Sequence, residues 1–331
     1  MSRVVALLAA VLALGLAIAG TGVAVGCGGD GAEPGASSEA TLVLDFQPNA
    51  VHTGVYTGLA RGEYEREGID LTVREPSAST DGPKLLAAGR TEFAILDIHD
   101  LAIARERGID VVGVGAIVHL PLAAVIAGDR HSVRTPADLA GRSVGVTGLP
   151  SDDGVLDSVL AAGGVDPGSV DRVTIGFDSV AALSAGKVDA ATAFWNAEGV
   201  QLRSLGIPTR EFRVSDFGAP PYPELVLATS ASTIARTSPG REARVDATSR
   251  GYADALDDPE AALDDLLAAV PALDADQQRD QLQALIDADA LRPTADLDPG
   301  SLARWSRWEA ERGIVARPVD VRSAFELSSS G

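Results

Sequence analysis

The segment Phe194-Trp195-Asn196-Ala197-Glu198 holds the chain's most concentrated group of side chains suited to binding a small molecule. An indole presents a flat face that can stack on an aromatic ring, which is worth about 0.5–1.5 kcal/mol beyond the area it buries. The Glu198 carboxylate can accept two N–H bonds, and such charge-assisted bonds are about twice as strong as neutral ones. Because a predicted strand ends at Phe194, we expect Trp195, Asn196 and Glu198 to face a ligand. The alternative is ordinary packing.

A second group follows the first predicted strand. The Asn49 amide can both donate and accept, which suits the ring nitrogen and exocyclic amine of an aminopyrimidine. His52 and Tyr56 are four residues apart and therefore share one face of the helix predicted from about residue 52 to 66. All three are candidates to line a ligand site, and for His52 this expectation comes from the family resemblance described below, in which the histidine position faces the cleft. The alternatives are a turn or helix cap for Asn49 and simple capping for His52.

Three further polar residues stand at the ends of predicted strands. Asp97 comes directly after a buried strand, so it either bonds a ligand N–H or caps the helix that begins near His99. Tyr222, between two prolines, either closes the edge of a pocket or belongs to a rigid hinge. His119 is a weaker candidate, with a satisfied core histidine as the alternative.

The loop 147–154 leads into a predicted helix, whose free N–H groups could receive a phosphate, sulfonate or carboxylate. It lacks the Gly-Lys-Ser/Thr ending of a nucleotide-binding loop, and Asp152 and Asp153 would repel an anion. An ordinary connection is the favoured interpretation. No Arg or Lys occurs in the predicted site loops, so an anionic ligand is disfavoured.

The elements that must position these residues form two α/β units. Predicted strands at 41–44, 71–73, 93–96 and 111–118 alternate with helices, and the pattern repeats from residue 135 onward. We predict a two-lobed α/β fold in which each lobe is a mostly parallel sheet flanked by helices. Lobe 1 comprises 41–124 and 225–331, with the C-terminal helices, and lobe 2 comprises 125–224. Ligands of such sheets bind beyond the carboxyl ends of the strands, so we expect the site between the lobes.

The N-terminus predicts export. Met1-Ser2-Arg3 precedes an apolar run over 4–25, and Ala24-Val25-Gly26 leads directly to Cys27. This pattern resembles the lipobox of bacterial lipoproteins, which predicts a signal peptide over 1–26, lipidation of Cys27 and a flexible tether over 27–40. The expected location is extracytoplasmic, anchored to the cell membrane. An uncleaved anchor helix, which needs about 20 apolar residues, is the alternative.

Composition excludes several classes of protein. The net charge is −20, and binding a nucleic acid backbone requires a basic surface, so nucleic acid is not an expected partner. Cys27 is the only cysteine, so the folded body has no disulfide and no cysteine-based zinc or iron–sulfur site. We predict a monomer with no cofactor, no metal and no catalytic residue.

Several segments together resemble one family. The stretch LDFQPNAVHTGVYTGLARGEYEREGIDLTV resembles the opening of the solute-binding proteins for pyrimidine precursors of thiamine, and it is similar to sulfonate- and riboflavin-binding components of ABC importers. Further matches are KLLAAGRTEFAI, TPADLAGRSVGV and LSAGKVDAATAFWNAEGVQL. The resemblance implies a type II periplasmic-binding-protein fold, whose lobes close on a ligand and then dock on a permease driven by an ATPase.

The function expected from the resemblance is therefore capture of an aminopyrimidine precursor of thiamine. Riboflavin, or another small heterocycle, is the alternative ligand. A third possibility is an enzyme, because fungal relatives make the thiamine pyrimidine from a histidine of their own chain and pyridoxal phosphate. His52 matches the family's histidine position, but the cysteine-rich motif of those relatives is absent and an export signal does not suit cytosolic chemistry. A tethered adhesion or signalling module is the remaining class.

Overall fold

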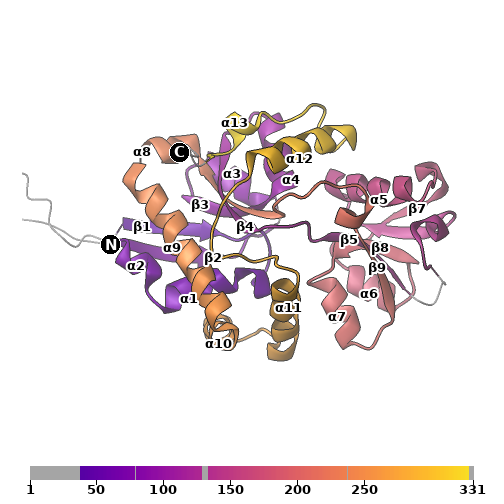
Figure 1. Ribbon diagram of the computed structural model, residues 1–331, viewed down its shortest axis with the longest axis horizontal. Coiled ribbons are helices and arrows are strands. Elements are labelled where there is room, and N and C mark those ends of the chain that lie inside the picture. Colours follow the sequence, from indigo (N-terminus) through magenta and orange to yellow (C-terminus); the bar gives the residue numbers. More distant parts are fainter. Residues whose placement is uncertain (1–37, 79, 129–132, 237, 328–331) are drawn as a thin grey trace, which may run out of the picture. The chain divides into compact units, whose positions relative to one another are not determined.

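A computed structural model describes residues 38–78, 80–128, 133–236 and 238–327. Two five-stranded sheets organise this part of the chain (Figure 1). The first has the order β2-β1-β3-β10-β4, built from β1 (Ser38–Val43), β2 (Ile69–Arg74), β3 (Phe93–Asp97), β4 (Val111–Val118) and β10 (Leu225–Ser230). The second has the order β7-β6-β8-β5-β9, built from β5 (Ala123–Gly128), β6 (Ser143–Val146), β7 (Asp171–Thr174), β8 (Ala190–Phe194) and β9 (Thr209–Arg213).

Each sheet runs mostly in one direction. Strand β1 pairs in parallel with β2 and β3, whereas β10 is antiparallel to both of its neighbours, β3 and β4. In the second sheet β6 pairs in parallel with β7 and β8, and β5 is antiparallel to β8 and β9. Four strands of each sheet therefore share a direction and one opposes them, which confirms the predicted two-lobed, mostly parallel α/β architecture.

The opposing strands β5 and β10 are the ones that follow the two crossings between the lobes. A single side chain joins these crossings, because the buried Glu224 carboxylate accepts hydrogen bonds from the backbone N–H groups of Leu122 and Ala123. The Oε2–N distance to Ala123 is 3.2 Å. A glutamate just before β10 thus fixes the backbone just before and at the start of β5.

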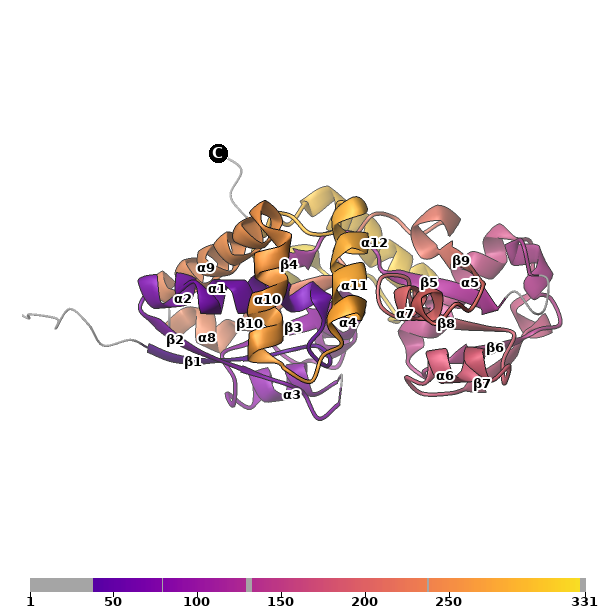
Figure 2. The same ribbon diagram turned by 90° about the horizontal axis from the view of Figure 1, so that it is seen from below.

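Helices cover both sheets. Those of lobe 1 are α1 (Thr53–Ala60), α2 (Glu63–Arg66), α3 (Asp81–Ala87), α4 (Ile98–Glu106), α8 (Ala231–Arg236), α9 (Ser238–Asp257), α10 (Pro259–Ala269), α11 (Ala275–Asp287), α12 (Pro299–Glu311) and α13 (Val321–Ala324). Those of lobe 2 are α5 (Pro150–Ala162), α6 (Ser179–Ser184) and α7 (Glu198–Ser204). Short 3-10 turns lie at Ala50–His52, Pro136–Leu139, Pro167–Ser169 and Val214–Phe217. Helix α11 lies beside α10 and also contacts α7 of the other lobe (Figure 2).

Close packing of α1 against α9 fixes the loop that precedes α1. A Cβ atom on Gly54 would lie 2.3 Å from the Tyr252 ring, and one on Gly251 would lie 2.1 Å from the Gly54 carbonyl oxygen. Only glycine permits this approach. The Tyr252 hydroxyl then donates to the Val51 carbonyl at 2.6 Å, which holds the segment between β1 and α1 in place.

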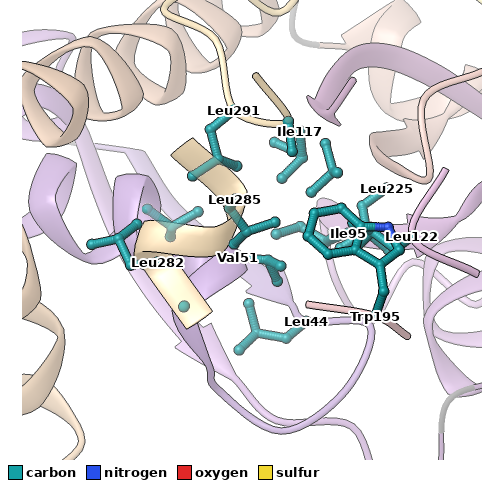
Figure 3. Close-up of a cluster of buried hydrophobic side chains, with 14 of the residues drawn as sticks. Leu44, Val51, Ile95, Ile117, Leu122, Trp195, Leu225, Leu282, Leu285 and Leu291 are labelled. Atoms are coloured by element: carbon teal, nitrogen blue, oxygen red, sulfur yellow. The ribbon is translucent and has the colours of Figure 1, made fainter. Parts of the chain in front are cut away.

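One hydrophobic cluster joins residues of both lobes and of the crossings between them. It includes Leu44 and Val51 from lobe 1, Leu122 and Leu225 at the crossings, and Trp195 at the end of β8 (Figure 3). Burying each such side chain contributes about 1.5–3 kcal/mol. This core therefore supports the loops that carry the polar residues.

The N-terminal boundary differs from the prediction. Strand β1 begins at Ser38, three residues before the predicted Thr41 and inside the range assigned to the tether, because Ser38, Glu39 and Ala40 already pair with Ile69, Asp70 and Leu71. The predicted signal peptide and Cys27 lie outside the described residues. Among the described helices, none combines the length and apolar character that crossing a bilayer demands.

Candidate ligand-binding site

A cavity of about 390 Å³ lies between the two sheets. Its walls come from the segments that follow β1, β3, β6, β7 and β8, from both crossings, and from helix α11. Strands β1, β3, β6 and β8 run in parallel pairs, so the cavity lies beyond their carboxyl ends, as expected for open α/β sheets. The volume falls in the range of about 300–1,000 Å³ usual for small-molecule sites.

Four of the eight predicted site residues line this cavity and four do not. Asn49, Asp97, Asn196 and Glu198 are among its lining residues. The structure places the other four behind the walls, and these are His52, Tyr56, Trp195 and Tyr222.

Asn49 and His52 form a capping box. Asn49 Oδ1 accepts from the Val51 N–H at 3.0 Å, and His52 Nδ1 accepts from the Asn49 N–H at 3.1 Å. With Nδ1 an acceptor, Nε2 carries the proton and donates to Asp45 Oδ1 at 2.8 Å. Asp45 lines the cavity, whereas His52 is fully buried. The expectation that His52 contacts the ligand is therefore corrected: it orients Asp45.

Tyr56 also lies away from the cavity, since it is only 8% exposed and packs within α1. Burial, reinforced by the nearby charge of Glu75, raises the pKa of its hydroxyl to about 12. Four-residue spacing places Tyr56 one turn beyond His52, and that whole face of the helix packs against the protein interior rather than the cleft.

Trp195 requires the largest correction. Its side chain is 1% exposed within the cluster of Figure 3, its indole N–H donates to the Pro121 carbonyl at 3.1 Å, and the Arg213 guanidinium lies 4.0 Å from the ring centroid. The N–H bond, the guanidinium over the ring and the buried position leave no exposed ring face for a ligand. Trp195 instead ties the end of β8 to the first crossing.

This placement makes Trp195 a stability residue. Trp195→Phe is expected to lower the free energy of unfolding by about 1–3 kcal/mol, because it leaves the buried Pro121 carbonyl without a donor. Trp305→Phe is the matched control, since that indole is equally buried and its N–H has no partner among the described residues. Urea unfolding measures both losses. An unchanged stability with a tenfold loss of ligand affinity in Trp195→Phe would contradict this assignment.

Glu198 combines a structural and a site role. It is the first residue of α7, and its Oε2 accepts from the Phe194 N–H at 2.9 Å. Burial raises the pKa of its carboxyl group. Asn196 is 1% exposed and lines the cavity, and its Oδ1 makes no hydrogen bond within the described structure.

An ionic cluster that the sequence did not predict forms the floor of the cavity. His99 contacts the Glu309 carboxylate through Nδ1, and its Nε2 lies 3.3 Å from the Tyr222 hydroxyl and 3.8 Å from Glu224 Oε1. Tyr222 is 1% exposed, so it supports His99 rather than closing the pocket edge. Asp97 caps α4 by accepting from the His99 N–H at 2.7 Å and also lines the cavity, so both of its predicted roles are compatible.

Burial and neighbouring charges shift the pKa values of this cluster strongly. Burial alone would lower the pKa of His99, but the carboxylates of Glu309 and Asp97 outweigh it and raise that pKa to about 10. Burial, followed by the charge of Asp97, raises the pKa of both Asp100 and Glu224 to about 7. His99 is therefore cationic at neutral pH.

Asp97, His99 and Glu224 bring ligand-type atoms within 4.8 Å of one another and are the group within the described residues that could hold a divalent cation. Both ring nitrogens of His99 already face protein oxygens, so the ionic cluster accounts for their proximity without a metal.

The charged residues that line the cavity are almost all acidic. They are Asp45, Asp97, Asp100, Asp152, Glu198 and Glu224, with His99 as the cationic group, and no described Lys or Arg lines it. In the loop considered for an anion, Asp152 accepts from the Thr147 N–H. A carboxylate therefore already binds an N–H group of the loop that was considered for an anion.

The cavity also holds buried acceptors that the described protein leaves without a hydrogen bond. They are Asn196 Oδ1, Glu224 Oε1, Gln278 Oε1 and Gln281 Oε1. An unsatisfied buried acceptor costs about 1–3 kcal/mol, so a ligand N–H that reaches one of these oxygens would recover that cost. The two glutamines are three residues apart on α11, which presents them from the same face.

Sequence comparison matches residues 49–262 to the family model described as NMT1/THI5 like. The formylaminopyrimidine-binding protein of Halalkalibacterium halodurans is 32% identical over 227 residues, which cover 68% of this chain and 69% of that protein. Riboflavin-binding protein RibY of Chloroflexus aurantiacus is 28% identical and covers 87% of this chain and 84% of its own. A 4-amino-5-hydroxymethyl-2-methylpyrimidine phosphate synthase of Schizosaccharomyces pombe is 24% identical over about half of each chain, 50% and 48%.

Structural comparison confirms the fold. The periplasmic aliphatic sulphonate binding protein SsuA from Escherichia coli superimposes with a TM-score of 0.71 at 16% identity, covering 87% of this chain and 92% of that one. At this identity the likeness shows the periplasmic-binding-protein fold alone.

Proposed function

This chain belongs to the NMT1/THI5-like family, and we propose that it is the lipid-anchored substrate-binding component of an ABC importer that captures an aminopyrimidine precursor of thiamine. The ligand would lie in the interlobe cavity, and the chain would deliver it from the outer or periplasmic face of the membrane to a permease. Cys27, which follows Ala24-Val25-Gly26, is the proposed lipidation site.

The observation that carries the proposal is the set of unpartnered acceptors in the cavity. Asn196, Gln278 and Gln281 each offer a buried oxygen without a donor, and Glu224 offers a fourth. An aminopyrimidine carries exocyclic N–H donors on a flat ring, which suits such a wall. The relative that binds a formylaminopyrimidine supports the same ligand class.

Charge separates this ligand from the sulfonates of the structural neighbours. A sulfonate would enter a cavity lined by six acidic side chains and one imidazolium, without a described Lys or Arg to receive it. Burying an unpaired anion beside like charges is strongly unfavourable. The sequence-based argument against an anionic ligand thus has structural support.

Riboflavin is the second candidate ligand. The riboflavin-binding relative matches a larger part of this chain than the pyrimidine-binding relative does, 87% against 68%, although at lower identity. Its flavin ring carries an imide N–H and its ribityl chain carries hydroxyl donors, so it could also satisfy the acceptors of the wall. The aminopyrimidine is placed first because the pyrimidine-binding relative has the higher identity, 32% against 28%.

The synthases among the relatives raise the question of an enzyme. They match about half of this chain, and the histidine proposed from the sequence as the family counterpart, His52, is fully buried against Asp45 and Asn49. A binding protein rather than a synthase is accordingly proposed. Incubation with pyridoxal phosphate and iron, followed by mass spectrometry of His52, would reveal a synthase through loss of imidazole mass.

Thermal unfolding against a ligand panel tests the proposal. At 100 times Kd, a ligand adds about 2.7 kcal/mol to the free energy of unfolding. We expect 4-amino-5-hydroxymethyl-2-methylpyrimidine and formylaminopyrimidine to raise the Tm, and an alkylsulfonate to leave it unchanged. A shift with riboflavin alone would replace the proposed ligand, and a shift with the sulfonate would contradict the charge argument.

A further inference from the structure

Two phenylalanines that the sequence did not single out meet at the cavity. Among the described residues, the exposed large hydrophobic side chains are Phe46, Phe177 and Leu205, at 37%, 55% and 59%. Phe46 and Phe177 both line the cavity, and their ring centroids are 5.4 Å apart with an interplanar angle of 37°. The exposed aromatic surface of the described chain is thus concentrated at the proposed site.

The two rings come from opposite lobes. Phe46 lies between β1 and α1, whereas Phe177 lies between β7 and α6. Contact between them therefore depends on the separation of the lobes. A centroid distance of 4.5–7 Å is the usual range for an aromatic pair, so the rings already interact.

Local structure holds each ring in position. On the lobe 1 side, Phe46 stands between Asp45, which binds His52, and the Asn49 cap. On the lobe 2 side, Gly176 has φ +59° and turns the chain immediately before Phe177. A side chain at Gly176 would be strained by this backbone conformation, although space is available there. Both rings therefore project from defined turns.

Because the protein covers neither ring fully, each retains aromatic surface that a flat ligand can cover. Trp195, the aromatic residue expected to stack on the ligand, is buried away from the cavity. Phe194 and several aliphatic side chains also line the cavity, but Phe46 and Phe177 are the lining aromatic residues with the most exposed ring surface.

We propose that Phe46 and Phe177 contact the face of the bound heterocycle, one from each lobe, and determine selectivity for a planar ring. This inference rests on the proposed function. A ring that touches both side chains buries apolar surface only when the lobes are close, so it binds the closed arrangement preferentially. A planar ligand therefore favours closure of the lobes.

Calorimetry and stopped-flow dissociation on the purified protein test this role. Phe46→Ala and Phe177→Ala should each raise the Kd for 4-amino-5-hydroxymethyl-2-methylpyrimidine about tenfold, mainly through faster dissociation. Phe177→Leu keeps an apolar side chain without a flat face and should recover only part of the affinity. Leu205→Ala, the matched exposed control outside the cavity, should bind as the wild type does.

A second measurement separates this inference from the choice of ligand. If the wild type binds riboflavin instead, the same variants are compared with riboflavin, and the same losses are expected. If neither compound binds, thermal unfolding of the two single variants and the double variant in the free protein measures the coupling of the pair. Unchanged Kd in both alanine variants, full recovery by leucine, or additive losses of stability in the free protein would overturn the proposal.

Discussion

Replacing His99 with alanine is expected to lower the free energy of unfolding by about 3–5 kcal/mol at pH 7.5, because removing one partner of a buried ion pair leaves its counter-charges unpaired. Glu309 and Glu224 are both fully buried and face the imidazole from different elements. Urea unfolding of the wild type and the variant measures the loss.

The pH dependence identifies the imidazolium as the source of this stability. The folded-state pKa of His99 is about 10, above its ordinary value of 6.5, so the folded state holds the proton more tightly. Its contribution is fully present below pH 6.5 and is lost as pH rises through 10. Wild-type stability should therefore fall between pH 7.5 and 10, and His99→Ala should lack this component of the fall.

His119→Ala provides the matched control. Burial, aided by the charge of Arg292, lowers the pKa of His119 to about 4, so this histidine is neutral across the same range. Its removal should cost less and leave the slope above pH 7.5 unchanged. Equal losses in the two alanine variants, with equal slopes, would show that the cluster around His99 contributes packing alone.

The architecture could be predicted because hydrophobic periodicity and turn residues are local signals. Predicted strands at 93–96 and 111–118 correspond to β3 (Phe93–Asp97) and β4 (Val111–Val118), and the loops after the strands do line the cavity. Two strands of lobe 2, β5 (Ala123–Gly128) and β9 (Thr209–Arg213), were not predicted as strands. In β9 only Phe212 is buried, Arg210 is exposed and the other residues are partly buried, and the strand pairs with β5 at the edge of the sheet.

The orientation of individual side chains could not be predicted, since it depends on long-range partners. Trp195 follows a strand just as a ligand-stacking residue would. Its N–H, however, donates to the Pro121 carbonyl, and its ring contacts the Arg213 guanidinium. Asp97 was singled out, whereas His99, two residues later, was considered only as a helix start. Its partners Glu224 and Glu309 lie more than 120 residues away in the chain, so nothing local indicates an ionic cluster.

The position of helix α11 at the cavity also could not be predicted from the sequence. Gln278 and Gln281 occur in a polar helix of lobe 1 that the sequence did not single out as part of the site. Contact of α11 with α7 of lobe 2 places both amides at the cavity. Three-residue spacing indicates a shared face, but only the tertiary structure says which face that is.

Replacing Glu224 with glutamine is expected to raise the Kd for an aminopyrimidine about 10–100-fold. It should lower the stability less than His99→Ala does, because Glu309 remains as a counter-charge to the imidazolium. The glutamine oxygen can still accept from the Leu122 and Ala123 N–H groups, so the link between the crossings survives. The position of Oε1, which makes no hydrogen bond and lies 3.8 Å from His99 Nε2, would instead hold an amide N–H₂, which repels a ligand donor. A hydrogen bond to a charged group contributes about 1.5–3 kcal/mol, and each 1.4 kcal/mol is a tenfold change in Kd.

Glu224→Ala separates the two roles of this side chain. It removes the link between the crossings as well as the acceptor, so it should lower stability more than the glutamine variant does, while both variants lower the affinity. Loss of affinity only in the alanine variant would mean that Glu224 acts through the crossings and does not accept a hydrogen bond from the ligand.

Titration of the same carboxyl group gives an independent signature. Since its pKa is about 7 in the folded protein, raised mainly by burial and then by the charge of Asp97, Glu224 is largely protonated at pH 6 and largely ionised at pH 8. A ligand that donates N–H binds the ionised form better, so wild-type affinity should rise from pH 6 to pH 8, and this rise should be reduced in Glu224→Gln. Asp100 also has a pKa of about 7 and lines the cavity, so Asp100→Asn is the necessary comparison. If the pH response persists in Glu224→Gln and disappears in Asp100→Asn, the donor group of the ligand faces Asp100, because only the carboxylate that receives the donor can couple its own ionisation to binding.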